Sequence, residues 1–260
     1  MRGTFLFLGT GGSTGIPLIG CKCAVCTSTS PRNQRLRPSA LIEVGGKRLL
    51  IDVGPDFRQQ ALTHGVDSVD GLLLTHTHYD HIAGVDELRV FYLRTKKPLP
   101  CLLSEESFEE LRKRYSYLFQ PIGEVTTISA QLEFQILEQE MGETHFLGLP
   151  IQYISYEQGQ MGVTGFRFGD LAYVSDICDY EEGVFVGLGG VKTLILSALS
   201  FEPSPVHLTI LEAIDFARRV GAERTWLTHL NHRIDHEEVD EKLPSDVRLG
   251  YDGLKLEFSL

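Results

Sequence analysis

The sequence is short of positive charge and has no long apolar run, and each shortage excludes a class of protein. Lysine and arginine number 24 against 35 aspartate and glutamate residues, which gives a net charge of −11 at pH 7. A broad basic surface for nucleic acid is therefore not expected, although one cleft could still be positive. No stretch approaches the roughly 20 apolar residues that a membrane helix needs.

Cysteine is also scarce, and its distribution argues against a disulfide framework. The five cysteines are an odd number in a chain of 260 residues, and three of them lie close together. This pattern favours metal ligation.

The first strand-like run, residues 4–8, is too short for the apolar core of a signal peptide and has no clear cleavage site after it. We therefore expect a cytoplasmic protein.

The most informative stretch is the apolar run 72–74, which ends in a cluster of histidines. His76, His78, Asp80 and His81 stand within six positions just behind it. The run predicts a buried strand that ends at a loop. Imidazole suits zinc, iron and manganese, and a carboxylate adds negative charge, so the cluster predicts a metal site. The alternative is a polar loop that happens to be rich in histidine.

A second metal motif lies near the start of the chain. Cys21, Cys23 and Cys26 supply three thiolates and leave one corner of a tetrahedral zinc site open. The fourth ligand must come from far along the chain, and we expect His232. Buried free thiols are the alternative interpretation.

Two further stretches could contact an anion. The Gly-rich loop 9–15 lacks the spacing of nucleotide-binding loops, so a tight loop beneath an active site is favoured over phosphate binding. Arg32, Arg35 and Arg37 stand in a polar stretch that predicts a solvated loop. The alternative is that one of them faces an anionic substrate, because guanidinium matches phosphate geometry.

Apolar periodicity and turn residues predict alternating strands and helices. Gly45 and Gly46 predict a hairpin between strands 39–44 and 48–53. Further strands are expected over 69–75, 98–103, 151–156, 171–176, 191–200, 225–228 and parts of 120–150 and 247–258. Helices are expected over 57–64, 82–93, 105–117 and 207–220. The pattern predicts one domain over residues 1–260, made of two similar halves whose sheets lie face to face with helices outside.

These motifs together resemble the signature of the metallo-β-lactamase superfamily. The histidine cluster follows an apolar strand, and the other motifs occur in the order of one subgroup. They are Leu8-Gly9-Thr10-Gly11, the cysteine triplet, Leu50-Ile51-Asp52-x-Gly54, Thr164-Gly165-Phe166, Asp176 and Thr228-His229-x-x-His232. The subgroup includes the cyclic phosphodiesterase of bacterial phosphonate breakdown, and tRNA 3′-processing endonucleases are more distant relatives. The resemblance implies a four-layer αββα sandwich of two mixed β-sheets flanked by helices.

The resemblance also implies two divalent metals, zinc or manganese, in the active site and one structural zinc. The implied ligands are His76 and His78 for the first metal, Asp80, His81 and His229 for the second, Asp176 as a bridge, and Cys21, Cys23, Cys26 and His232 for the structural zinc. The implied catalytic residues are Asp80, Asp176 and His207. Of these, His207 would protonate the leaving group. Asp52 matches a residue that orients a metal-bound histidine.

One position departs from the subgroup, which has a histidine where Gln158 stands before Gly159. An amide oxygen is a neutral and harder ligand than imidazole, and it binds zinc more weakly. We therefore expect Gln158 to give a weak first metal site, or one that prefers manganese or magnesium. Glu157 or His145 could compensate.

The leading hypothesis is a two-metal phosphodiesterase that acts on a small or cyclic phosphodiester, with no membrane partner. One alternative is a metal- or nucleotide-binding homologue with weakened catalysis. Another is a hydrolase of a different ester, a thioester or an RNA end. Acidic charge and the lack of a long insertion disfavour RNA and other nucleic acids. Homodimers occur among related proteins, so we expect a homodimer.

Overall fold

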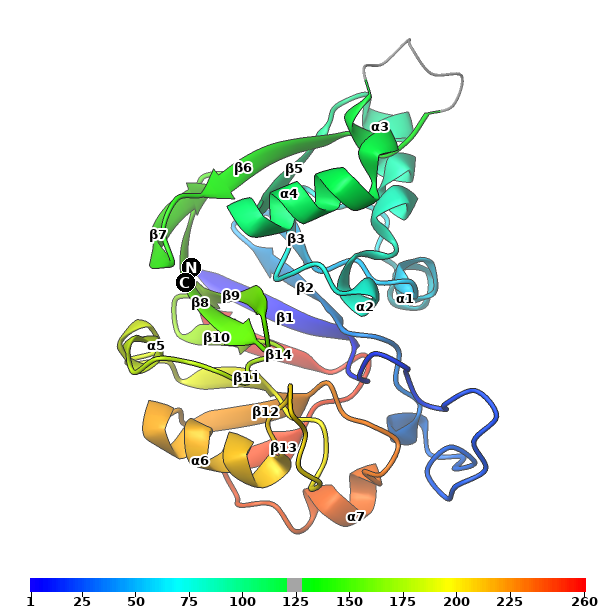
Figure 1. Ribbon diagram of the computed structural model, residues 1–260, viewed down its shortest axis with the longest axis vertical. Coiled ribbons are helices and arrows are strands. Elements are labelled where there is room, and N and C mark those ends of the chain that lie inside the picture. The colour runs from blue at the N-terminus through cyan, green and yellow to red at the C-terminus, as the bar shows by residue number, and fades with distance from the viewer. Residues whose placement is uncertain (121–127) are drawn as a thin grey trace.

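A computed structural model describes residues 1–120 and 128–260, and they form two seven-stranded sheets that lie face to face (Figure 1). The first sheet has the order β14 (Lys255–Ser259), β1 (Arg2–Gly9), β2 (Ser39–Val44), β3 (Lys47–Ile51), β4 (Gly71–Leu73), β5 (Leu99–Ser104), β6 (Leu132–Leu137). The second has the order β13 (Val247–Leu249), β12 (Arg224–Thr228), β11 (Thr193–Ser197), β10 (Leu171–Val174), β9 (Met161–Phe168), β8 (Leu149–Gln158), β7 (Met141–Phe146).

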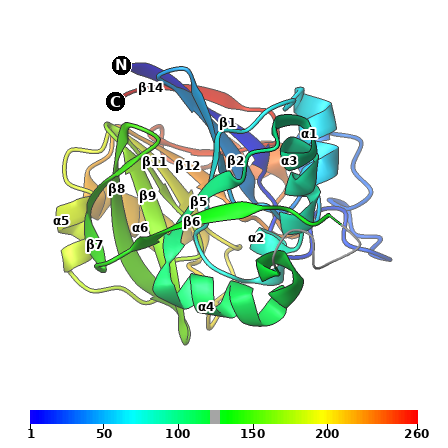
Figure 2. The same cartoon turned by 90° about the horizontal axis from the view of Figure 1, so that it is seen from above.

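Helices cover the outer faces of both sheets (Figure 2). Those beside the first sheet are α1 (Phe57–His64), α2 (Tyr79–Ile82), α3 (Arg89–Thr95) and α4 (Glu105–Arg114). Those beside the second are α5 (Gly183–Gly187), α6 (Ile210–Val220) and α7 (His236–Asp240). The predicted αββα sandwich is therefore confirmed. Among the described residues, no helix has the length and apolarity that crossing a membrane requires.

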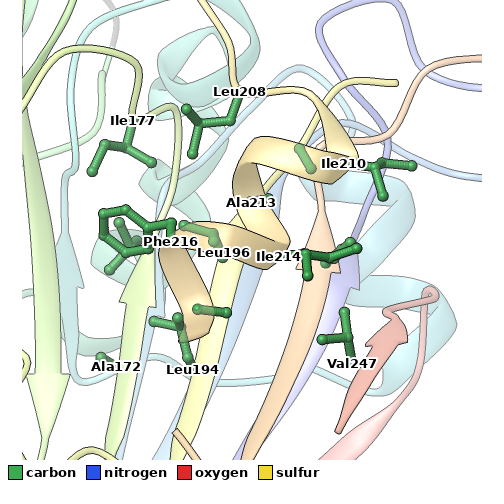
Figure 3. Close-up of a cluster of buried hydrophobic side chains, with 14 of the residues drawn as sticks. Ala172, Ile177, Leu194, Leu196, Leu208, Ile210, Ala213, Ile214, Phe216 and Val247 are labelled. Atoms are coloured by element: carbon green, nitrogen blue, oxygen red, sulfur yellow. The ribbon is translucent and has the colours of Figure 1, made fainter. Parts of the chain in front are cut away.

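Side-chain alternation along the strands builds three apolar layers. In β1, Phe5 and Phe7 face the second sheet, while Leu6 and Leu8 face the helices of their own half. The central strands bury both faces, so they appear in the sequence as continuous apolar runs. The outer layer beneath α6 is drawn in Figure 3, where one face of that helix meets the side chains of β10, β11 and β13.

The same pairing pattern occurs in both sheets. Each has antiparallel pairs at one end and parallel pairs at the other, with β3, β4, β5 and β6 parallel in the first and β10, β11, β12 and β13 parallel in the second. This order agrees with two similar halves in one domain, which we keep as a prediction.

The predicted hairpin is confirmed, since β2 and β3 pair around Gly45 and Gly46. Both glycines have positive φ, 59° and 72°, which a two-residue hairpin turn requires. The helix predicted over 82–93 is wrong as a single element. Gly84 N–H donates to Val53 O (2.8 Å), and a Cβ on Gly84 would lie 2.1 Å from Gly54 O, so a backbone contact breaks the helix there.

Two other predicted helices have different ends. The helix expected over 105–117 stops at Arg114, and a 3-10 turn follows at Ser116–Phe119. The helix expected from His207 begins at Ile210, so His207 lies in the loop before it. The strands predicted within 120–150 are β6, β7 and the start of β8, and the part at 121–127 lies outside the described residues.

Candidate metal centre

The carboxyl ends of strands from both sheets meet at one edge of the sandwich. Asp52 follows β3, the histidine cluster follows β4, Asp176 follows β10 and His229 follows β12. A backbone hydrogen bond from Thr164 N to Thr75 O (2.9 Å) joins the two sheets there.

Three of these strand ends turn sharply through a left-handed residue. Asp52, Asp176 and His229 have φ values of 58°, 55° and 63°. Such a conformation is uncommon for residues other than glycine, and it is found where the surrounding structure holds it in place. The turn lets each side chain leave its strand toward the same point.

The converging side chains form two groups of possible metal donors. The first cation position consists of His76, His78 and Asp176, and the second consists of Asp80, His81, Asp176 and His229. Within each group the possible ligand atoms lie within 4.8 Å of one another. Asp176 belongs to both groups, with Oδ2 at 3.5 Å from His76 Nε2 and at 3.3 Å from His81 Nε2.

The electrostatics of these groups fit divalent cations. Burial raises the pKa of Asp176, but the charges of His229 and His81 outweigh it and hold that pKa well below its usual value. Burial lowers the pKa of His81, but nearby carboxylates raise it well above its usual value. A protonated histidine thus balances buried carboxylates, and a metal can take the place of that proton. The Nε2 atom of His81 is buried and has no hydrogen-bond partner among the described residues.

Asp52 and the Gly-rich loop support this centre from behind. The carboxylate of Asp52 is fully buried and accepts a hydrogen bond from His81 Nδ1 (2.7 Å), which directs His81 Nε2 toward the cluster. The loop 9–15 lies against the other side, where Gly12 N donates to Leu230 O (2.9 Å) and a Cβ on Gly12 would lie 3.4 Å from the ring of His229. The interpretation of this loop as a tight turn beneath the site fits this geometry.

His207 lies against His229 at the rim of the centre, and Gln158 contacts His207. The ring centroid of His207 is 4.7 Å from that of His229, and burial lowers the pKa of His207 to about 4. Gln158 Nε2 is 3.3 Å from each ring nitrogen of His207. Gln158 Oε1 is buried and has no hydrogen-bond partner in the part of the chain that the structure describes. Leaving a buried acceptor unbonded costs about 1–3 kcal/mol, so this oxygen is suited to a ligand.

Neither of the residues proposed to replace the missing imidazole reaches the centre. Glu157 is exposed on β8, because alternation along the strand turns it away from the face that buries Gln158. His145 is exposed on β7, where it pairs with Pro150. The expectation that Glu157 or His145 compensates is therefore wrong.

The cysteine triplet and His232 meet as a separate group. His232 Nδ1 is 3.4 Å from Cys21 Sγ and 3.5 Å from Cys23 Sγ, and these three residues lie with Cys26 within 4.8 Å. The backbone N–H of Cys26 and the side chain of His232 lower the pKa of Cys23 to about 6, despite some desolvation. Three thiol groups and one imidazole are a donor set that suits tetrahedral zinc.

The three arginines of the polar stretch have protein partners. Arg35 is buried and donates to Thr10 Oγ1 (2.7 Å). Arg37 pairs with Asp56 (2.8 Å), and Arg32 lies 4.7 Å from the ring centroid of Tyr251. These contacts favour a structural role for all three over the alternative of substrate contact.

Another arginine, Arg114, lies at the edge of the centre, and the sequence did not indicate this position. Arg114, the last residue of α4, donates from Nη1 to Thr77 O (2.7 Å), between the two histidines of the first cation position. Its charge contributes to lowering the pKa of His78, after the larger effect of burial. In the sequence it appears as one of three basic residues in a charged helix, which indicates only a solvated face.

Comparison with known proteins decides the family. The family model described as a beta-lactamase superfamily domain matches residues 47–230. The chain belongs to the beta-lactamase superfamily. It is similar to a solved structure described as a new diphosphatase from the PhnP family, with 35% identity, a TM-score of 0.91, and coverage of 99% of this chain and 98% of that one. That identity places it in the PhnP family within the superfamily.

Two relatives carry other names. An octanoyltransferase of Porphyromonas gingivalis is 34% identical over 260 residues, which cover 96% of this chain but only 50% of that protein. The chain therefore spans half the length of that relative. A ribonuclease Z of Methanopyrus kandleri is 25% identical over 91% of this chain and 90% of its own length. This membership agrees with the metal-dependent hydrolase that the motifs predict.

Proposed function

We propose that the chain is a two-cation phosphodiesterase that hydrolyses a small or cyclic phosphodiester, or the phosphoanhydride bond of a small diphosphate. The observation that carries the proposal is the pair of adjoining donor groups that share Asp176. The similarity to a PhnP-family diphosphatase supports a phosphate substrate. The similarity to a ribonuclease Z supports a phosphodiester bond as the bond that is cleaved. The net charge of −11 favours a small substrate over RNA.

The residues have the following proposed places. His76, His78 and Asp176 hold one cation, while Asp80, His81, His229 and the shared Asp176 hold the other. Zinc and manganese suit these donors. Bound divalent cations supply Lewis-acid chemistry that neutralises phosphate charge and produces a nucleophile from water at neutral pH. The cysteine group holds a structural zinc.

The chain itself supplies charge balance, orientation and a proton. Asp80 and Asp176 carry the negative charge that holds the cations together, and Asp52 keeps the ring of His81 in place through its 2.7 Å contact. His207 is neutral in the free protein because burial lowers its pKa to about 4. An approaching phosphate raises that pKa, since negative charge favours the imidazolium. His207 then protonates the departing oxygen as a general acid.

A second candidate substrate is an ester or thioester, because half of the octanoyltransferase relative matches this chain. A further alternative is a metal- or nucleotide-binding protein with weakened catalysis. The homodimer expected among such proteins is a further proposal, and sedimentation analysis would test it.

The test is hydrolysis by protein of known metal content. We expect turnover of bis-p-nitrophenyl phosphate, a nucleoside cyclic phosphate or a dinucleoside diphosphate, and none of an acyl thioester. His207→Ala should lower kcat by about 100-fold, the scale of a lost general acid. The matched control is Asp67→Asn, which changes an exposed surface carboxylate. Absence of turnover of every phosphate ester, with two active-site metals measured per chain, would exclude the proposal.

A further inference from the structure

The two cation positions differ in the number and charge of their donors. The second position has four donors, of which Asp80 and Asp176 are carboxylates, and all four are buried. The first position has three donors, and its one carboxylate is the shared Asp176. His78 is also half-buried, whereas the other donors of both positions are buried. A cation in the first position therefore has less negative charge around it and more contact with water.

Gln158, which contacts His207, is a neutral side chain whose amide oxygen has no hydrogen-bond partner among the described residues. It is 5% exposed, and Oε1 has no hydrogen-bond partner among residues 1–120 and 128–260. Its Nε2 atom contacts His207, whose ring stacks obliquely against His229 and which also feels the charges of Asp176, Asp80 and His78. The amide thus reaches the centre through the ring of His207, and its oxygen has no other partner among the described residues.

We propose that the two cation positions are unequal, and that Gln158 Oε1 supplies the fourth donor of the first one. The second position keeps its cation. The first position exchanges its cation with the solution and accepts manganese or magnesium in preference to zinc. The reason is that an amide oxygen is hard and neutral, so it suits manganese and magnesium better than it suits zinc. This inference rests on the two-cation site of the proposed function.

The same amide would link the first cation to His207. With Oε1 on the cation, Nε2 is directed at the ring of His207, from which it is 3.3 Å away. One side chain then sets both the coordination of the first position and the orientation of the general acid. Gln158 is in this sense a positioning residue.

The test counts metals and measures their affinities in the purified full-length chain. Wild type, Gln158→His and Gln158→Ala are loaded with zinc, dialysed against metal-free buffer and analysed by mass spectrometry. We expect wild type to keep two zinc ions per chain, one in the cysteine group and one in the second position. Gln158→His should keep three. In competition with a zinc-binding dye, the third zinc should bind at least about tenfold more weakly to wild type than to Gln158→His, a typical scale for changes around a metal.

Two further variants make the result specific. Gln152→His places a histidine on an exposed position of the same strand, and it should keep two zinc ions like wild type. Gln158→Ala should also keep two, but it should bind one Mn²⁺, followed by electron paramagnetic resonance, at least about tenfold more weakly than wild type. This last comparison decides the matter even if Gln158→His does not fold.

The opposite results would overturn the inference. They are wild type that keeps three zinc ions, Gln158→His that keeps no more than wild type, or equal Mn²⁺ binding by wild type and Gln158→Ala. Hydrolysis is a separate readout. If the metal counts agree but no phosphate ester is hydrolysed, the proposed function fails and this inference stands. If phosphate esters are hydrolysed by protein that keeps three zinc ions, this inference fails alone.

Discussion

Asp52 accepts three hydrogen bonds with one fully buried carboxylate. Its oxygens accept hydrogen bonds from Thr75 N (2.8 Å), Thr75 Oγ1 (2.8 Å) and His81 Nδ1 (2.7 Å). Asn tolerates the left-handed backbone of this residue, but its amide nitrogen cannot accept a bond. Asp52→Asn should therefore weaken metal binding by about 10- to 100-fold, measured by competition with a chelator. The exposed Asp67→Asn is the control, and equal affinity of the two variants would contradict the role of Asp52.

Asp252 makes stability depend on pH in a direction opposite to most carboxylates. Burial raises its pKa from 3.8 to about 6, although Leu36 N and Thr10 Oγ1 donate to it. The folded protein therefore holds this proton more tightly than the unfolded chain. The resulting stabilisation is complete below about pH 4 and is lost as the pH rises through 6. The loss amounts to about 3 kcal/mol, at 1.36 kcal/mol per pKa unit.

Urea unfolding of wild type and Asp252→Asn between pH 4 and pH 7 measures this effect. The other titrating groups are common to both proteins and cancel in the difference. We expect the free energy of unfolding of wild type to fall relative to the variant as the pH rises. A difference that is independent of pH would show that Asp252 does not titrate in this range.

At the scale of elements, α6 shows how a local signal places a site residue. Ile210, Ala213 and Ile214 form the face that covers the second sheet (Figure 3). The helix begins with a capping box, in which Thr209 Oγ1 accepts from Glu212 N (3.2 Å) and Glu212 Oε2 accepts from Thr209 N (2.8 Å). This cap fixes the start of the helix at Ile210, three residues after His207.

Removing that cap should loosen the first turn of α6. Thr209→Ala should lower the free energy of unfolding by about 1 kcal/mol, as measured with denaturant. Thr209→Ser keeps the hydroxyl and should remain within a few tenths of a kcal/mol of wild type. Equal losses in both variants would mean that the methyl group, and not the cap, is responsible.

The sequence predicted those features that depend on residues close together in the chain. The Gly45-Gly46 hairpin follows from backbone freedom at the turn, and the metal motifs follow from residue types that have few other uses together. The break at Gly84 could not be predicted, because it depends on contact with Gly54, 30 positions earlier. The meeting of Gln158 and His207 was equally hidden, since 49 positions separate them.

At the scale of the whole molecule, the cysteine group fastens the two ends of the sequence together. Cys23 Sγ lies 3.5 Å from His232 Nδ1 across 209 positions of sequence. Arg35 and Gly250 add a second connection between the same regions (2.5 Å). Spacing and resemblance predicted that these four residues meet, but the arginine connection needed the fold.

Loss of the zinc proposed for the cysteine group should therefore destabilise the whole chain. Cys23→Ser should bind one zinc fewer and melt roughly 5–10 °C lower, which corresponds to about 2.7 kcal/mol of binding energy for a metal at 100 times its Kd. Elemental analysis and thermal melting measure the two effects. Cys178→Ser, which changes a half-buried thiol outside the group, should do neither. Full zinc content in Cys23→Ser would contradict a structural zinc here.

The pairing of β1 with β14 brings Met1 beside Leu260, where the amino group donates to the last carbonyl at 2.6 Å. The metal centre lies beyond the other end of β1, past Gly9. A short peptide could join the two termini without crossing the molecule, and the chain could be reopened at the exposed Lys96–Lys97 connection between α3 and β5. The fold should thus tolerate circular permutation with its catalytic edge untouched.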